Sequence, residues 1–140
     1  MGENPILLVE DEPDDVEFLR RAFSLAGVTR PLVVFDNTKA SIEYLAGEGQ
    51  YADREKHPLP RLVMVDLRLV GMPGHEVIAW MRARRAFDGT KIIVLSSLYD
   101  EGHRREAYRL GANSYLVKST SFEELCAKVK NIAENWLGPE

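Results

Sequence analysis

Four apolar runs in the sequence each end on polar side chains that could do phosphate or metal chemistry. Glu10 and Asp11 follow the first run, Asp66 ends another, and Ser96 and Lys118 end two more. Clustered carboxylates repel one another unless a cation lies between them, and oxygen ligands with open water positions favour Mg²⁺. An ammonium and a hydroxyl suit phosphoryl oxygens. A carboxylate in such a site can accept the phosphoryl group as a nucleophile, so Asp66 is the candidate.

These side chains meet only if the runs before them are parallel strands of one sheet. Five short runs rich in branched apolar residues are typical of strands buried on both faces. They lie at residues 5–9, 32–35, 61–66, 91–95 and 114–117. Helical patterns alternate with them, which predicts an α/β fold of five βα units with right-handed crossovers and helices on both faces. We expect a doubly wound parallel sheet of flavodoxin-like order 2-1-3-4-5, whose switch point lies beside Asp11 and Asp66.

The helices begin and end at recognisable residues. Pro13 suits a first helical turn, and we expect Asp14, Asp15 and Glu17 to stabilise the dipole of that helix rather than to join the site. Asn37 or Thr38 is expected to cap the second helix. The polar segment 47–60 is interpreted as an exposed loop.

Composition limits the function. The chain has 140 residues, 45% of them apolar, which is the size of a single domain spanning 1–140. A net charge of -4 argues against nucleic-acid binding. Cys126 is the only cysteine, so no intrachain disulfide forms. No long apolar stretch predicts a signal peptide or a membrane span, and we expect a cytoplasmic protein.

The motifs, in order, resemble the receiver domain of two-component response regulators over essentially the whole chain. The resemblance rests on four strand ends, which are Val9-Glu10-Asp11, the strand at Asp66, Leu95-Ser96-Ser97, and Tyr115-Leu116-Val117-Lys118.

The resemblance implies that Asp66 accepts a phosphoryl group from a histidine kinase. It implies that Asp11 and Asp66 bind Mg²⁺, with Glu10 beside them and the backbone carbonyl of Arg68 as a further ligand. The product would be a switch in a phosphorelay, not a metabolite, so we do not expect an enzyme.

The same resemblance gives roles to three residues around the phosphoryl group. Ser96 would donate a hydrogen bond to one of its oxygens, Lys118 would pair with another, and Tyr115 would swing inward when Ser96 moves.

Both ends of the chain look like stand-alone regulators of bacterial phytochromes and hybrid-type kinases. This would imply such a kinase as partner, no output domain, and a homodimer formed through the fourth helix, fifth strand and fifth helix.

Three positions depart from the receiver pattern. Val70 replaces a common proline, Pro73 precedes Gly74 where an acidic or small residue is usual, and Ser119 replaces a cis proline, so we expect a trans bond after Lys118. Arg68 and Leu98 lie where receivers tune the lifetime of their phosphate. Arg68 could screen water or pair with Glu10.

Three alternative functions differ in how well the sequence fits them. A dehalogenase-type phosphatase needs a second aspartate where Arg68 stands, and a flavin phosphate would be repelled by the acids after the first strand. A receiver-like docking module that works without phosphorylation is the main alternative, because of the three departures. We expect solvated side chains for the three histidines, exposed helix faces for the arginines, a buried thiol at Cys126, and packing or an interface at the two tryptophans. These residues are His57, His75, His103, Arg82, Arg84, Arg85, Arg104, Arg105, Arg109, Cys126, Trp80 and Trp136.

Overall fold

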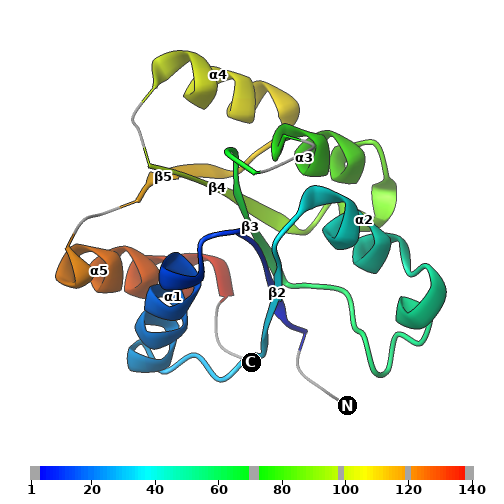
Figure 1. The fold of residues 1–140 in the computed structure, drawn as a ribbon, viewed down its shortest axis with the longest axis horizontal. Coiled ribbons are helices and arrows are strands. Elements are labelled where there is room, and N and C mark those ends of the chain that lie inside the picture. Colours follow the sequence, from blue (N-terminus) through cyan, green and yellow to red (C-terminus); the bar gives the residue numbers. More distant parts are fainter. Residues whose placement is uncertain (1–3, 70–72, 98–99, 119–120, 138–140) are drawn as a thin grey trace.

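A five-stranded parallel sheet lies between two layers of helices (Figure 1). The computed structural model describes residues 4–69, 73–97, 100–118 and 121–137. The strand order is β2-β1-β3-β4-β5, so the predicted doubly wound topology is confirmed. Helices α1 and α5 cover one face of the sheet, and α2, α3 and α4 cover the other (Figure 1).

The strands and helices fall close to the predicted ranges. The strands are β1 Ile6–Val9, β2 Leu32–Phe35, β3 Leu62–Asp66, β4 Lys91–Ser96 and β5 Ser114–Val117. The helices are α1 Pro13–Leu25, α2 Thr38–Ala46, α3 His75–Arg82, α4 Glu101–Leu110 and α5 Phe122–Ile132. The described residues also form the 3₁₀ turns η1 Gly49–Tyr51 and η2 Arg85–Phe87 and the π-helical turn η3 Ala133–Leu137.

Alternation along the central strands builds two apolar cores. In β1, Ile6 and Leu8 join the core beneath α1 and α5, whereas Leu7 and Val9 join the core beneath α2, α3 and α4. All four are fully buried, and each such side chain contributes about 1.5 to 3 kcal/mol of transfer free energy. Because both faces are buried, a strand cannot slip by one residue without exchanging its two cores. The register that positions the site is therefore strongly fixed.

The helix boundaries follow from local chemistry. Pro13 is the first residue of α1. Asn37 begins α2, since its side chain accepts a hydrogen bond from the Ala40 N–H at 2.8 Å, which decides between the two predicted caps. Gly111 ends α4 with φ at 115°, a left-handed conformation that glycine adopts without strain.

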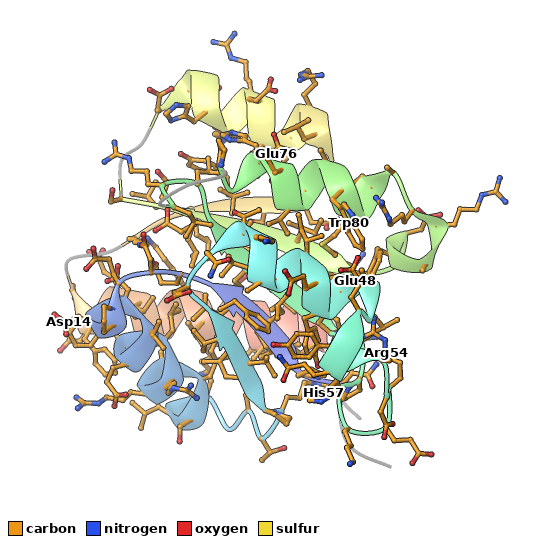
Figure 2. The ribbon with its side chains drawn as sticks, turned by 45° about the vertical axis from the view of Figure 1, so that its right-hand side comes forward. Asp14, Glu48, Arg54, His57, Glu76 and Trp80 are labelled. Atoms are coloured by element: carbon orange, nitrogen blue, oxygen red, sulfur yellow. The ribbon has the colours of Figure 1, made fainter. Side chains whose placement is uncertain are left out.

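The segment from 47 to 60 is more ordered than the expected exposed loop. Arg54 donates hydrogen bonds to the carbonyls of Tyr44, Leu45 and His57, at 2.9, 2.7 and 3.1 Å. The rings of Tyr44, Tyr51 and His57 pack against one another, and Figure 2 shows Arg54 and His57 side by side below α2. His57 is half-buried, so the expectation of a solvated side chain was wrong.

Arg82 and His75 also differ from expectation. Arg82 is half-buried and donates to the carbonyls of Gly111, Phe87 and Thr90 and to Asn113 Oδ1, at 3.0, 2.6, 2.9 and 3.0 Å. It thereby ties α3 to the turns before β4 and after α4. His75 is half-buried against His103, with ring centroids 6.3 Å apart.

Within the described ranges, every helix is too short or too polar to cross a bilayer.

Candidate functional site

Strand register brings the predicted side chains to one edge of the sheet. Val9 pairs with Val65, so the residue after each, Glu10 and Asp66, lie beside one another where β1 and β3 end. Ser96 pairs with Val117, which places Lys118 directly beyond the end of β5. This is the carboxyl edge at the switch point, between β1 and β3, where ligands bind in doubly wound sheets.

Three carboxylates form a cluster at this edge. One oxygen of each of Glu10, Asp11 and Asp66 lies within 4.8 Å of the others. Glu10 and Asp66 are buried, whereas Asp11 is partly exposed. Glu10 Oε2 accepts hydrogen bonds from the backbone N–H groups of Asp11 and Glu12, at 3.0 and 3.2 Å. These bonds orient its other oxygen, Oε1, toward the cluster.

Lys118 supplies the positive charge among these carboxylates. Its Nζ lies 2.5 Å from Glu10 Oε1, 2.6 Å from Asp66 Oδ2 and 2.8 Å from Asp15 Oδ2. Burial by itself would lower the pKa of Lys118, but the carboxylates around it outweigh burial and raise that pKa. Lys118 therefore stays charged throughout the physiological range.

Glu10 responds in the opposite way to its surroundings. Burial raises the pKa of Glu10 to about 7; Lys118 opposes this rise, and the charge of Asp66 adds to it. A buried carboxylate that protonates this readily gains from a further cation, because the cation would favour its charged form.

The backbone around Asp66 is tightly packed. The N–H of Arg68 donates to Asp66 Oδ1 at 2.8 Å, while the Arg68 side chain is exposed. A Cβ added at Gly74 would lie 2.3 Å from the carbonyl oxygen of Asp66. A side chain at position 74 would therefore clash with the backbone of Asp66, which explains the glycine there. The part that Arg68 plays for a metal or for phosphate lifetime stays a prediction.

Ser96 and Tyr115 lie on the two strands next to the cluster. Ser96 is buried at the end of β4, and its carbonyl accepts from the Lys118 N–H at 2.6 Å. Tyr115 is half-buried against the core beneath α2, α3 and α4. Their expected contacts with a phosphoryl group stay predictions. The departures at Val70 and Ser119, the trans bond expected at Ser119, and Leu98 lie outside the described residues.

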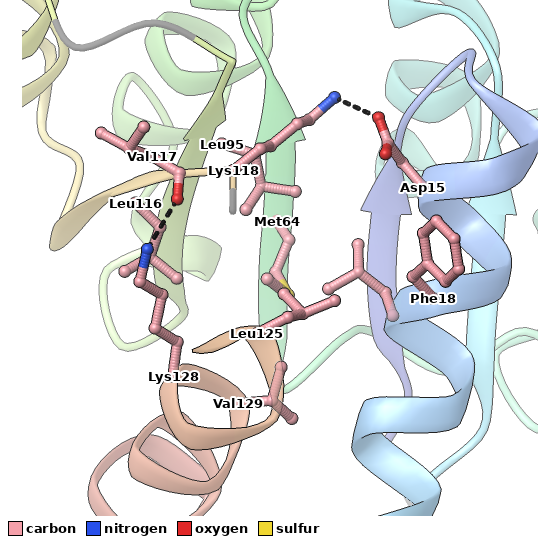
Figure 3. Close-up of a pocket in the computed structure, with 11 residues that line it drawn as sticks. Asp15, Phe18, Met64, Leu95, Leu116, Val117, Lys118, Leu125, Lys128 and Val129 are labelled. Carbon is pink, nitrogen blue, oxygen red and sulfur yellow. Dashed lines mark hydrogen bonds and ion pairs between the residues drawn. The ribbon is translucent and has the colours of Figure 1, made fainter. Parts of the chain in front are cut away.

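Asp15 is the residue that sequence reasoning missed. The sequence predicts that Asp15 stabilises the dipole of α1, and Asp15 does lie in the first turn of that helix. Its side chain nevertheless crosses to Lys118, as Figure 3 shows. The sequence does contain a feature that could have indicated this contact. Asp15 lies in the first turn of a helix that begins two residues after the acidic pair Glu10 and Asp11.

The donor set fits a hard divalent cation. Carboxylate oxygens are the ligands that Mg²⁺ and Mn²⁺ prefer, and Mg²⁺ usually binds through one or two carboxylates and several waters. Asp11 is open to solvent on one side, which leaves room for those waters. Glu10, Asp11 and Asp66 are the residues that would hold the ion.

The sheet order and the acidic cluster at its switch point define a flavodoxin-like α/β domain built around a strand-end aspartate. The response regulator receiver domain family matches residues 6–130, so the chain belongs to that family.

Two proteins with similar sequences are also regulators. The probable methanogenesis regulatory protein FilR2 of Methanothrix harundinacea is 35% identical over 139 residues, which covers 98% of this chain and 87% of that protein. Response regulator Rcp1 of Synechocystis is 29% identical over 132 residues, covering 94% and 88%. The chain thus matches relatives that are little longer than itself.

A solved structure extends the similarity to phytochrome-associated regulators. The phosphorylated cyanobacterial phytochrome response regulator RcpA superposes with a TM-score of 0.88 at 30% identity, covering 97% of this chain and 95% of that one. Rcp1 has also been solved in a Mn²⁺-bound form.

Proposed function

We propose that this chain is a phosphorelay switch whose Asp66 accepts a phosphoryl group from a histidine kinase in a Mg²⁺-dependent reaction. The observation that carries the proposal is the convergence of Glu10, Asp11, Asp66 and Lys118 at the switch point of a receiver fold. A carboxylate oxygen of Asp66 attacks phosphorus while the bond from phosphorus to the donor breaks. The product is a mixed anhydride on Asp66, and the leaving group takes a proton.

The residues around Asp66 favour this step. The Arg68 N–H holds Oδ1, which directs Oδ2 toward Lys118. The Lys118 ammonium lies 2.6 Å from that oxygen and is within reach of an incoming phosphoryl oxygen, where it offsets developing negative charge. A bound Mg²⁺ would supply further charge neutralisation of the phosphoryl oxygens. Ser96, buried on the neighbouring strand, would donate a hydrogen bond from its hydroxyl, and Tyr115 would follow its movement.

Partners follow from the family and its named members. We propose a histidine kinase as phosphodonor, and the similarity to the phytochrome response regulator RcpA favours a phytochrome-type sensor. We also propose a homodimer through α4, β5 and α5, where Tyr108 is 39% exposed. Sedimentation of the protein and of Tyr108→Glu, with and without phosphorylation, tests the dimer. An unchanged monomer under all conditions would contradict it.

Docking without phosphorylation is the second candidate, motivated by the departures from the receiver pattern. One observation weakens it. Three acidic side chains contact a single ammonium, and a fourth, Asp11, lies in the same cluster, an arrangement that a docking module does not need. A domain that had lost its chemistry would have no reason to bury Glu10 and Asp66 together.

The test is intact mass after incubation with acetyl phosphate and Mg²⁺. We expect one phosphoryl mass on the wild type and none after chelation of the metal or in Asp66→Asn. Asp36→Asn is the matched control, because Asp36 is another aspartate at the carboxyl end of a strand, and it is exposed; it should react like the wild type. Failure with acetyl phosphate and with a phosphorylated kinase would overturn the proposal and favour the docking module.

A further inference from the structure

One carboxylate at the site lies outside the group that would hold the cation. The described cluster of possible metal ligands is Glu10, Asp11 and Asp66, yet Lys118 also pairs with Asp15 Oδ2 at 2.8 Å. Asp15 reaches the site from α1, across the edge of the sheet (Figure 3). Its side chain is 36% exposed, whereas the side chains of Glu10 and Asp66 are almost completely buried.

Lys118 and a bound cation would use two of the same carboxylates, those of Glu10 and Asp66. Lys118 Nζ is in contact with Glu10 Oε1 and Asp66 Oδ2, and these are two of the three carboxylates that would hold Mg²⁺. Two positive groups cannot share both carboxylates at contact distance without strong repulsion. Cation binding therefore requires the ammonium to give up part of these contacts.

The structure provides a place for the ammonium and room for it to move. Because Asp15 is not one of the clustered metal ligands, its carboxylate can stay paired with Lys118 when a cation binds Glu10 and Asp66. The hollow beside the aliphatic stem of Lys118 has a volume of about 40 Å³ and lies between α1 and α5 (Figure 3). Its walls are mainly apolar, so they accommodate the stem rather than the charge. They include Leu19, Met64, Leu95, Leu125 and Val129.

We propose that Asp15 is a positioning residue that holds the Lys118 ammonium when a divalent cation takes over Glu10 and Asp66. Asp15 thereby favours cation binding. This inference rests on the proposed function for its purpose, but the exchange of partners can be measured without any phosphorylation.

The test is Mg²⁺ titration by calorimetry on the full chain. Asp15→Asn should weaken Mg²⁺ binding about three- to fivefold, the upper range for one partly exposed ion pair. Asp14→Asn is the matched control, since it removes the same charge from the adjacent, exposed residue of the same helical turn; its affinity should stay near that of the wild type. Asp15→Glu keeps a carboxylate at this position, so its Mg²⁺ affinity should be closer to that of the wild type than the affinity of Asp15→Asn.

A double-mutant cycle with Lys118→Met separates positioning from a direct effect on the metal. Lys118→Met removes the competitor, so adding Asp15→Asn to it should weaken Mg²⁺ binding no more than Asp14→Asn does. A full Asp15→Asn effect in that background would mean that Asp15 acts on the cation itself and would overturn the proposal. Equal affinities for Asp15→Asn and Asp14→Asn would overturn it as well.

Phosphorylation gives a separate readout. With acetyl phosphate, Asp15→Asn should require more Mg²⁺ for half-maximal rate while its rate at saturating Mg²⁺ stays near that of the wild type. A lower maximal rate with an unchanged Mg²⁺ requirement would contradict the proposal. If the wild type is not phosphorylated at all, the proposed function fails, and the calorimetric cycle still decides the role of Asp15.

Discussion

Gly74→Ala should destabilise the protein although its backbone suits alanine. Gly74 has φ of -59° and ψ of -25°, values that any residue adopts. An added Cβ would, however, lie 2.3 Å from the carbonyl oxygen of Asp66, whereas an ordinary close carbon–oxygen contact is about 3.3 Å. The two segments must therefore separate by about 1 Å, and both atoms at the contact belong to backbone or are fixed to it.

Overpacking of this kind typically costs 1 to 3 kcal/mol, and we expect about 2 to 3 kcal/mol here because no flexible side chain can yield. Urea unfolding measures the loss. Gly89→Ala is the control, since a Cβ at Gly89 meets no atom within 4 Å, and it should change the free energy of unfolding by no more than about 0.5 kcal/mol.

The same substitution tests the link between packing and chemistry. A displaced Asp66 carbonyl moves the carboxylate relative to Lys118, so Gly74→Ala should also be phosphorylated more slowly than Gly89→Ala. Equal unfolding free energies for the two variants would refute the steric argument.

Three further predictions concern stability. Arg82→Met should lower the free energy of unfolding by about 2 to 4 kcal/mol, because four hydrogen bonds from a charged, half-buried group disappear together. Arg105→Met, which changes an exposed guanidinium, should lower it by less than about 1 kcal/mol in the same urea assay. Similar losses in the two variants would contradict this role of Arg82. Asn37→Ala should lower the free energy of unfolding by about 1 kcal/mol because it removes the α2 cap, whereas Asn37→Asp should keep most of that stability. An unaltered unfolding midpoint in Asn37→Ala would show that the cap contributes nothing. Burial lowers the pKa of His75 below its ordinary value, so the unfolded chain binds the proton first. The stability that the buried neutral ring contributes to the folded protein is therefore fully present above about pH 6.5 and is lost as the pH falls below that value. The wild type should thus lose stability relative to His75→Phe on acidification below pH 7, and a pH-independent difference between the two would contradict the shift.

The sequence was sufficient to predict which side chains converge at this edge of the sheet, because each of them stands at the end of a strand. Once residues 5–9 and 61–66 are strands buried on both faces, parallel pairing places Glu10 beside Asp66 with no further information. Lys118 follows in the same way from the fifth strand. The residues that converge here are separated by long stretches of chain, but each is the first polar group after an apolar run, and this is a local pattern.

The misses share a different cause, since each depends on how two elements approach one another. Asp15 contacts Lys118 because the first turn of α1 lies close to the end of β5, and its dipole role gave no hint of this. Arg82 looked like part of an exposed basic run, yet its partners are carbonyls in turns far along the chain. His75 likewise is half-buried only because α4 packs over the start of α3. Helical periodicity in one segment does not contain these distances.

The proposed switch requires that Asp66 itself carries the phosphoryl group. The most direct measurement is borohydride reduction of the protein after treatment with a phosphodonor and Mg²⁺, followed by peptide sequencing by mass spectrometry, because borohydride converts an aspartyl phosphate to homoserine. We expect homoserine at position 66, and only in the presence of Mg²⁺. Homoserine at Asp11 or Asp15, or a stable phosphoryl group on a histidine with position 66 unchanged, would contradict it.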